Sequence, residues 1–193
     1  MFSHILLSLR AQIYVGMKRL DAYEVSFFGL KEGHHKFEYK IDKQFFESFD
    51  FEEFQEANVQ VDLDFVKKSN MLELHFAGQG TVVVPCDVTN EPFDLPVEGH
   101  LDLVVKFGET FNDDNEEVLI LPHGEHQLNV AQYIYEMIVL SVPKKRIHPG
   151  IADGTLKSEI LDKLEELSPS KKKKKDDIDP RWEDLKKLLI DKK

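Results

Sequence analysis

Histidine and carboxylate side chains lie close together in one stretch of the 193-residue sequence. His123, Glu125 and His126 fall within PHGEH, and imidazole and carboxylate groups are ligands that zinc binds in proteins. With Asp113 or Asp114 nearby, they could serve a metal-binding protein or a metal-dependent hydrolase. The set lies on a predicted loop, with no second pair of ligands and no thiolate beside it. We therefore keep this metal site only as an alternative.

The sequence holds a single cysteine, Cys86. One thiol excludes an internal disulfide and is typical of a protein in a reducing compartment such as the cytoplasm. The sequence has no Ser/His/Asp motif, phosphate-cradling glycine loop or dinucleotide fingerprint. We therefore expect no catalytic residue, no cofactor and no small-molecule substrate.

The charge of the chain is acidic overall and unevenly distributed. The formal net charge is -11, and residues 144–193 hold 15 Lys and Arg against 11 Asp and Glu, which leaves 10 against 25 for residues 1–143. The body therefore carries a net charge of -15 and the tail a net charge of +4. An acidic body attracts basic partners and repels nucleic-acid phosphates, whereas a basic tail does the reverse.

The basic charge of the tail is concentrated in a run of lysines from Lys171 to Lys175. Consecutive lysines repel each other, which favours a solvated linker, and they also attract phosphate. Asp179 and Pro180 then cap and begin a short predicted helix that carries the only tryptophan of the chain. We expect a docking element here, and the candidate contacts to RNA or to a partner protein are Lys171, Lys172, Lys173, Lys174, Lys175, Arg181 and Trp182.

The strongest structural pattern is a predicted hairpin between Gly78 and Gly108. Residues 81–84 form a β-branched run that ends at Pro85, and residues 95–107 alternate between apolar and polar, as a strand with one buried face does. Cys86 lies in the loop between them. The acidic stretch 109–117 is expected to be a mobile loop. Further strands are predicted for residues 59–66, 72–76 and 118–121, together with a strand pair within residues 17–39.

Two segments of the body have the pattern of helices. Asp42 can cap a short helix whose phenylalanines recur at helical spacing, and we expect the run of phenylalanines from Phe45 to Phe54 to be a lid on the core. The best-defined helix follows Asn129, which is expected to cap it with Gln132 completing a capping box, and it ends before Pro143. Its broad apolar stripe must pack on the sheet.

These elements predict an α+β fold. We expect a curved, mostly antiparallel sheet of about six to eight strands with one main packed helix and a helical C-terminal tail, and a barrel-like closure of the sheet is left open. Residues 17–150 are expected to form this domain, residues 151–193 a mobile helical tail with a lysine-rich linker, and residues 1–16 a disordered or non-native start extension. Because no stretch approaches the roughly 18 apolar residues of a membrane helix, no membrane partner is expected.

Three stretches of the sequence, taken in order, resemble the YceD family of bacterial and plastid proteins. They are VVVPCDVTNEPFDLPVEG, EMIVLSVPKKRIHP and DPRWEDLKKL. From Met17 onward, the chain is similar to the form found in the Bacteroidetes. The positions that match the family motifs are Cys86, Glu136, Leu140, Pro143, His148, Asp179, Pro180 and Arg181.

The resemblance implies a non-enzymatic factor in bacterial ribosome biogenesis that supports the accumulation of large-subunit ribosomal RNA. The expected partner is a basic ribosomal protein, large-subunit rRNA in a precursor particle, or both. A scaffold that binds protein alone stays open as a further alternative.

The chain departs from the family pattern beside Cys86. Val88 stands where family members carry an arginine, and Thr89 stands where they carry a second cysteine. This departure removes a paired-thiol zinc or redox site. Cys86 is then expected to be a small, half-buried hydrophobe. We further expect Glu136 to pair with a basic residue such as Arg146 or Arg181.

Overall fold

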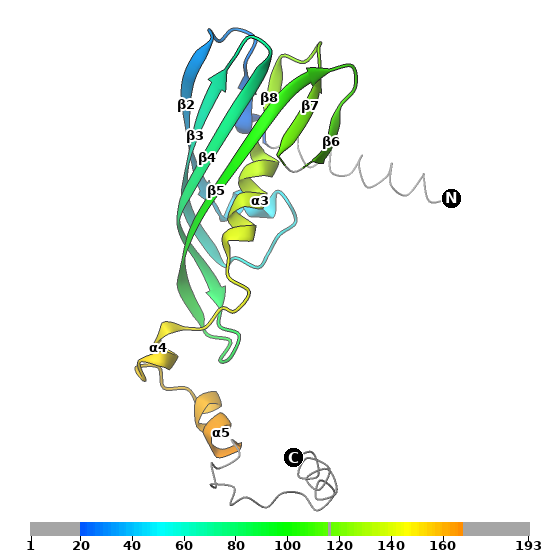
Figure 1. Cartoon of the computed structure of the whole chain (residues 1–193). Helices are drawn as coiled ribbons and strands as arrows, with labels where there is room; N and C mark the ends of the chain where they lie inside the picture. The colour runs from blue at the N-terminus through cyan, green and yellow to red at the C-terminus, as the bar shows by residue number, and fades with distance from the viewer. Residues whose placement is uncertain (1–19, 116, 168–193) are drawn as a thin grey trace, which may run out of the picture. The chain divides into compact units, whose positions relative to one another are not determined.

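The larger sheet is built on the long strands β2 (Gly33–Asp42), β3 (Glu56–Lys67), β4 (Met71–Pro85) and β5 (Pro92–Gly108) (Figure 1). The structure is a computed structural model that describes residues 20–115 and 117–167. By its contacts the chain divides into two units, Met1–Gly154 and Thr155–Lys193. The sheets lie in the first unit, which confirms the predicted α+β class.

The order of strands in this sheet is β2-β3-β4-β5-β7-β6, and the short strands β6 (Asn112–Asn115) and β7 (Val118–Pro122) extend it. All neighbouring strands are antiparallel except β5 and β7, which are parallel. The mostly antiparallel prediction is therefore confirmed. The barrel-like alternative is wrong, because no pairing within the described ranges joins the edge strands β2 and β6, and the sheet stays open.

The predicted hairpin is confirmed, with Met71 opposite Lys106 and Pro85 opposite Pro92. The strands predicted separately at residues 72–76 and 81–84 are one 15-residue strand, β4. Gly78 and Gly80, which lie between these two segments, allow close packing. A Cβ atom built on Gly80 would lie 2.2 Å from the backbone oxygen of Asn58 in β3.

The main helix, α3 (Ala131–Ser141), packs on the inner face of the sheet over β4 and β5. Gly78 and Gly99 face each other across these strands, and a Cβ atom on Gly99 would lie 3.0 Å from Met137 Cγ. Ile134 and Ile138 of α3 are buried in the same core. The close approach of helix and sheet thus depends on residues without side chains.

Helix α3 begins one residue later than predicted, with Val130 at the N-cap position. The Asn129 side chain still accepts a hydrogen bond from the Ala131 N–H at 2.9 Å, so it satisfies one free donor of the first turn. The predicted capping box is wrong, because the Gln132 amide donates to Glu136. The helix ends at Ser141, two residues before Pro143, as expected from the missing N–H of proline.

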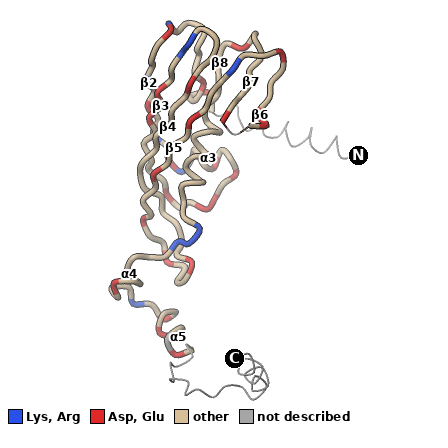
Figure 2. The backbone as a smooth tube through the Cα atoms, viewed as in Figure 1, with Lys and Arg blue, Asp and Glu red and all other residues tan. Residues whose placement is uncertain are grey.

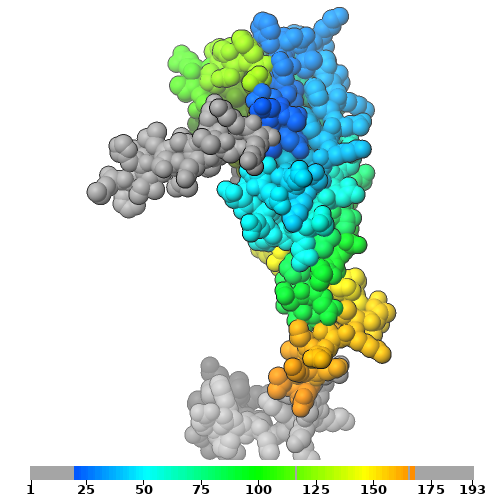
Figure 3. Space-filling view, turned by 180° about the vertical axis from the view of Figure 1, so that it is seen from behind, coloured from blue at the N-terminus to red at the C-terminus, as the bar shows by residue number. Residues whose placement is uncertain are grey.

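An aromatic lid covers the remainder of the inner face, as predicted. Helix α2 (Lys43–Glu47) is capped by Asp42, whose Oδ1 accepts from the Phe45 N–H at 3.2 Å. Phe46 and Phe54 meet edge to face at 4.8 Å between ring centroids, and Phe49 stacks on Tyr135 of α3 at 4.5 Å. Seen from behind, this cyan segment forms the surface between the blue first strands and the green end of the β4–β5 hairpin (Figure 3).

A second, two-stranded sheet pairs β1 (Glu24–Ser26) with β8 (Gln127–Asn129), after a single 3₁₀ turn, η2 (Asp21–Tyr23). The predicted strand pair within residues 17–39 is therefore wrong, because β1 does not pair with β2. Val25 and Leu128 lie opposite each other and are both buried, which is the apolar contact that selects this partner. The predicted mobile loop at 109–117 is also wrong in part, since it contains β6.

Within the described ranges, two short helices follow α3. Helix α4 (Pro149–Ala152) closes the first unit, and α5 (Glu159–Leu167) lies in the second unit, where a helix was expected. The proposed lysine linker, Asp179 to Trp182 and the start extension lie outside the described residues, so the domain limits stay predictions. No helix within the described ranges is long and apolar enough to cross a bilayer.

We predict that Gly80→Ala lowers the free energy of unfolding by about 1–3 kcal/mol, because the added methyl group would push β4 away from the β3 backbone. Urea denaturation followed by circular dichroism measures this loss. Gly29→Ala is the control, since a Cβ atom there meets nothing within 4 Å. Equal unfolding free energies for both variants would contradict the close packing of β3 and β4.

Candidate functional site

The family-motif positions Cys86 and His148, 62 residues apart in sequence, meet in the structure. The His148 backbone N–H donates to Cys86 Sγ at 3.3 Å, and the His148 ring packs beside Phe93 at 5.5 Å between ring centroids. His148 Nδ1 accepts from the Gly150 N–H at 2.9 Å and so caps α4. Together these contacts tie the loop after β4 to the segment after α3.

Cys86 is buried in this junction, with 2% of its surface exposed, so the half-buried expectation is wrong. Thr89, at the position of the family's second cysteine, is also buried and contacts the thiol. Burial alone would raise the pKa of the Cys86 thiol, but hydrogen bonds from the His148 backbone and the Thr89 side chain outweigh it, and the net shift is downward. A buried thiol held in this way connects two segments of the chain.

Arg146 reinforces the same junction. Its backbone N–H donates to Asp87 Oδ2 at 2.7 Å, and the Asp87 N–H donates back to the Arg146 carbonyl at 2.8 Å. The Arg146 guanidinium donates to Glu53 at 2.9 Å. The predicted Glu136–Arg146 pair is therefore wrong, because the chain beyond α3 carries Arg146 to the loop after β4. Arg181, the other expected partner, lies outside the described residues.

Acidic residues recur along β2 to β5 (Figure 2), and many of them lie on the surface of these strands that points away from α3, here called the outer face. Strand alternation fixes this face, because every second side chain of each strand points to it. Its lysines are Lys36, Lys40 and Lys106. Its more numerous acidic residues are Glu38, Glu56, Asp62, Asp64, Glu73, Asp94, Glu98 and Asp102.

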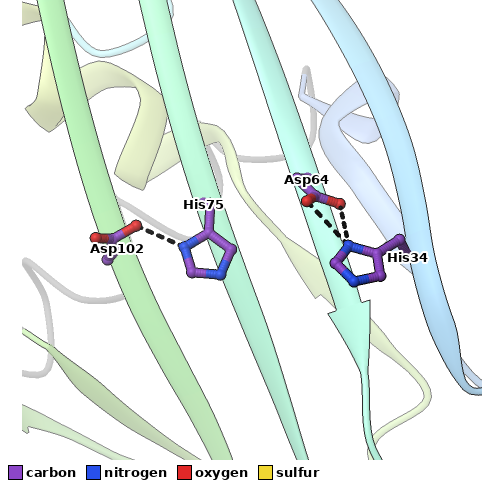
Figure 4. A network of polar contacts seen from close by, with 4 residues as sticks. All are labelled: His34, Asp64, His75 and Asp102. Atoms are coloured by element: carbon purple, nitrogen blue, oxygen red, sulfur yellow. Dashed lines mark hydrogen bonds and ion pairs between the residues drawn. The ribbon is translucent and has the colours of Figure 1, made fainter.

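Two histidine–aspartate pairs lie on the outer face (Figure 4). His75 Nδ1 is 2.7 Å from Asp102 Oδ1, and His34 Nδ1 is 3.1 Å from Asp64 Oδ2. Asp62 and Asp64 share this face because every second side chain of β3 points to it, whereas the sequence analysis missed the histidines. The same alternation could have found them, since His75 lies directly opposite both Asp64 and Asp102.

A shallow groove of about 570 Å³ lies on the outer face, and its lining includes Asp64, His75, Ala77 and Asp102. Among the described residues, no hydroxyl or thiol group is hydrogen-bonded to either imidazole. The pairs therefore lack the nucleophile that histidine–carboxylate chemistry would activate. What this face offers is negative charge and hydrogen-bond acceptors to a partner.

A second groove, of about 620 Å³, lies between α3 and β5 and is called the α3–β5 groove. Its apolar lining includes Leu101, Leu103 and Met137, and Asp113 and Glu136 stand at its polar side. Burial, Asp113 and Glu136 raise the pKa of Tyr133, which also lines this groove, to about 12. Glu136 and Leu140, two family-motif positions, thus belong to this groove and lie apart from the Cys86 junction.

The alternative metal site gains no support from the structure. Within residues 20–115 and 117–167, no three His, Cys, Asp or Glu side chains come together as a group that could hold a metal ion. The His126 ring packs against Phe28 at 4.7 Å, and the His123 ring lies 6.5 Å from that of Phe107. These histidines thus make aromatic contacts at separate places.

The fold and its surface define an α+β protein whose open sheet is packed by one helix and presents an acidic face. A match to the family described as "large ribosomal RNA subunit accumulation protein YceD" covers residues 74–189, more than half of the chain. The chain therefore belongs to the YceD family, and this places it among proteins of large-subunit ribosomal RNA accumulation. No match was found among curated proteins or among solved structures.

We predict that Arg146→Ala lowers the free energy of unfolding by about 1–2 kcal/mol, because the variant loses its ion pairs with Glu53 and Asp87. Thermal unfolding followed by circular dichroism measures this change. Lys145→Ala, which removes an exposed cation from the same segment, is the control and should stay within about 0.5 kcal/mol of the unsubstituted protein. An equally large loss of stability in Lys145→Ala would show that removing any positive charge from this segment destabilises the protein, and that the contacts of Arg146 at the junction are not the cause.

The raised pKa values of Tyr39 and Tyr133 predict a loss of stability at high pH. Both tyrosines ionise at about 12 in the folded protein and at the ordinary value of 10.0 when unfolded, so their contribution is complete below pH 10.0 and is lost as the pH rises toward 12. Urea denaturation at about pH 9 and about pH 11 should show this fall. Tyr133→Phe should reduce the difference between the two pH values, and an unchanged difference would contradict the raised pKa.

Proposed function

We propose that this protein supports the accumulation of large-subunit ribosomal RNA by binding a basic ribosomal protein through its acidic outer face. The family supplies the process, and the charge of the outer face is the observation that carries the choice of partner. Carboxylates on several neighbouring strands favour lysine and arginine side chains and repel phosphates. Exposed acidic groups also raise the association rate with a basic protein at low salt.

The proposed role is non-enzymatic and cytoplasmic. A basic ribosomal protein carries excess positive charge before it meets rRNA, and a rigid acidic sheet can neutralise that charge until assembly. The outer face suits this role because its side chains are held by antiparallel ladders in continuous register from β2 to β5. It can thus present its carboxylates at fixed spacing.

The basic tail is proposed as a separate contact to rRNA in the precursor particle. Lys171 to Lys175, Arg181 and Trp182 combine positive charge with an aromatic ring, which is the combination that binds single-stranded RNA. This contact would bring the acidic body and its ribosomal protein to the RNA. The two contacts have opposite charge, so they can be tested independently.

Binding of purified large-subunit ribosomal proteins tests the first contact. We expect immobilised protein to retain a basic ribosomal protein at low salt, and Asp62→Lys with Asp102→Lys to weaken this binding by roughly tenfold or more. Glu32→Lys with Glu125→Lys is the control, since it changes the net charge equally at exposed positions off the outer face. Failure to retain any ribosomal protein, or equal weakening by both pairs, would overturn the proposal.

Binding of purified large-subunit rRNA at several salt concentrations tests the second contact. Affinity should fall steeply with salt and disappear on deletion of residues 171–193, because phosphate binding by lysines releases counterions. Binding that survives the deletion would place the RNA contact elsewhere in the chain. Retention of protein without any rRNA would favour the scaffold alternative.

A further inference from the structure

Strand β5 has a partner along only part of one edge. It pairs with β4 from Pro92 to Lys106 but with β7 only from Val104 to Gly108. In the part of the chain that the structure describes, the edge from Glu98 to Leu103 therefore has no neighbouring strand. A free strand edge presents backbone donors and acceptors that can pair with another chain.

The direction in which these backbone groups point follows from the first hydrogen bond that β5 makes on its β7 side. The Val104 N–H donates to the Glu117 carbonyl at 2.9 Å, so Val104 faces away from β4. Because this direction repeats every second residue, the N–H and C=O groups of Glu98, His100 and Asp102 face the free edge. Pro96 has no N–H, so the useful edge ends near Glu98.

The α3–β5 groove lies directly beside this edge. Glu98, His100 and Leu101 line it on the strand side, and Tyr133 and Leu140 line it on the helix side. The Leu140 side chain is 82% exposed, which is unusual for a large apolar residue on a helix that packs on a core. The groove is therefore an apolar surface next to unpaired backbone groups.

We infer that this edge binds an extended, basic segment of a protein partner as an added strand beside β5, with apolar side chains in the α3–β5 groove and Lys or Arg toward the outer face. The inference rests on the proposed function and specifies how the basic partner is recognised. Main-chain hydrogen bonds would supply affinity, and the two faces of the added strand would supply specificity.

The alternation of apolar and basic residues in the proposed partner segment follows from the two environments on either side of the free edge. On one side an added strand would meet Tyr133 and Leu140, and on the other its side chains would lie next to those of Glu98 and Asp102. Successive side chains of a strand point to opposite faces. A segment with apolar and basic residues in turn therefore satisfies both faces, and charge complementarity selects basic over acidic residues.

Labelled peptides of about eight residues test this mode of binding by fluorescence anisotropy. The probe alternates Val and Arg, and one control has the same composition with all Val residues before all Arg residues. A second control keeps the alternating order but carries N-methyl groups on alternate amides, which removes backbone donors without changing charge. We expect the probe to bind roughly tenfold or more tightly than either control. Equal binding of all three would overturn the inference, because charge alone would then explain it.

A matched pair of protein variants locates the site. Leu140→Asp should weaken binding of the alternating peptide by roughly tenfold or more, since it places a carboxylate where an apolar side chain packs. Phe28→Asp is the control, because Phe28 is also exposed, at 73%, but does not line the groove. Melting temperatures of both variants exclude a loss of fold. Equal peptide binding by the two variants would overturn the placement of the site.

The same variants separate this inference from the proposed function. If Leu140→Asp retains full binding of the ribosomal protein and Asp62→Lys with Asp102→Lys loses it, the strand-addition inference fails and the outer-face proposal stands. If no basic ribosomal protein binds the unsubstituted chain, the proposed function itself fails. If Leu140→Asp loses ribosomal-protein binding and Phe28→Asp retains it, the result would support strand addition for the natural partner.

Discussion

The structure depends on the close packing of α3 against the β4–β5 hairpin. Gly78 and Gly99 leave room for the helix, and Met137 fills the space that their side chains would occupy. One helix and an aromatic lid then bury the inner face of the sheet. Because α3 and the lid lie on this side, the outer face of the described part of the chain is left free to carry charge.

The second constraint is the junction of Cys86, Asp87, Arg146 and His148. It fixes where the chain goes after α3, since the Arg146 N–H donates to the Asp87 carboxylate and the Asp87 N–H donates to the Arg146 carbonyl. The residue types fit such a role: the thiol is buried, and the arginine bridges two carboxylates. The family-motif positions Cys86 and His148 have side chains that could take part in chemistry, but in the structure they stabilise the fold. The charged surfaces that suit binding lie on the sheet and beside α3.

The proposed contacts all follow from the distribution of charge in the chain. The outer face and the α3–β5 groove are acidic at their polar sides, and the tail is basic. Such a division allows one chain to attract a basic protein and an anionic nucleic acid at different places without the two partners competing. The free edge of β5 borders the outer face, so strand pairing and charge attraction could act on the same partner segment.

The sequence by itself determined the α+β class, the β4–β5 hairpin, the Asp42 cap, the aromatic lid and the main helix, because each follows from local periodicity and turn chemistry. The common face of Asp62 and Asp64 also follows from the sequence, because alternation along a strand is a local property. Only the tertiary structure decided the pairing of β1 with β8, the open sheet, the contact of Cys86 with His148 and the true partners of Arg146. These depend on contacts between residues far apart in sequence, where many pairings satisfy the same local pattern and packing selects one of them. Gly78 and Gly80 show the difference: the sequence gives only two residues without side chains, and the fold shows that they make room for α3 and β3.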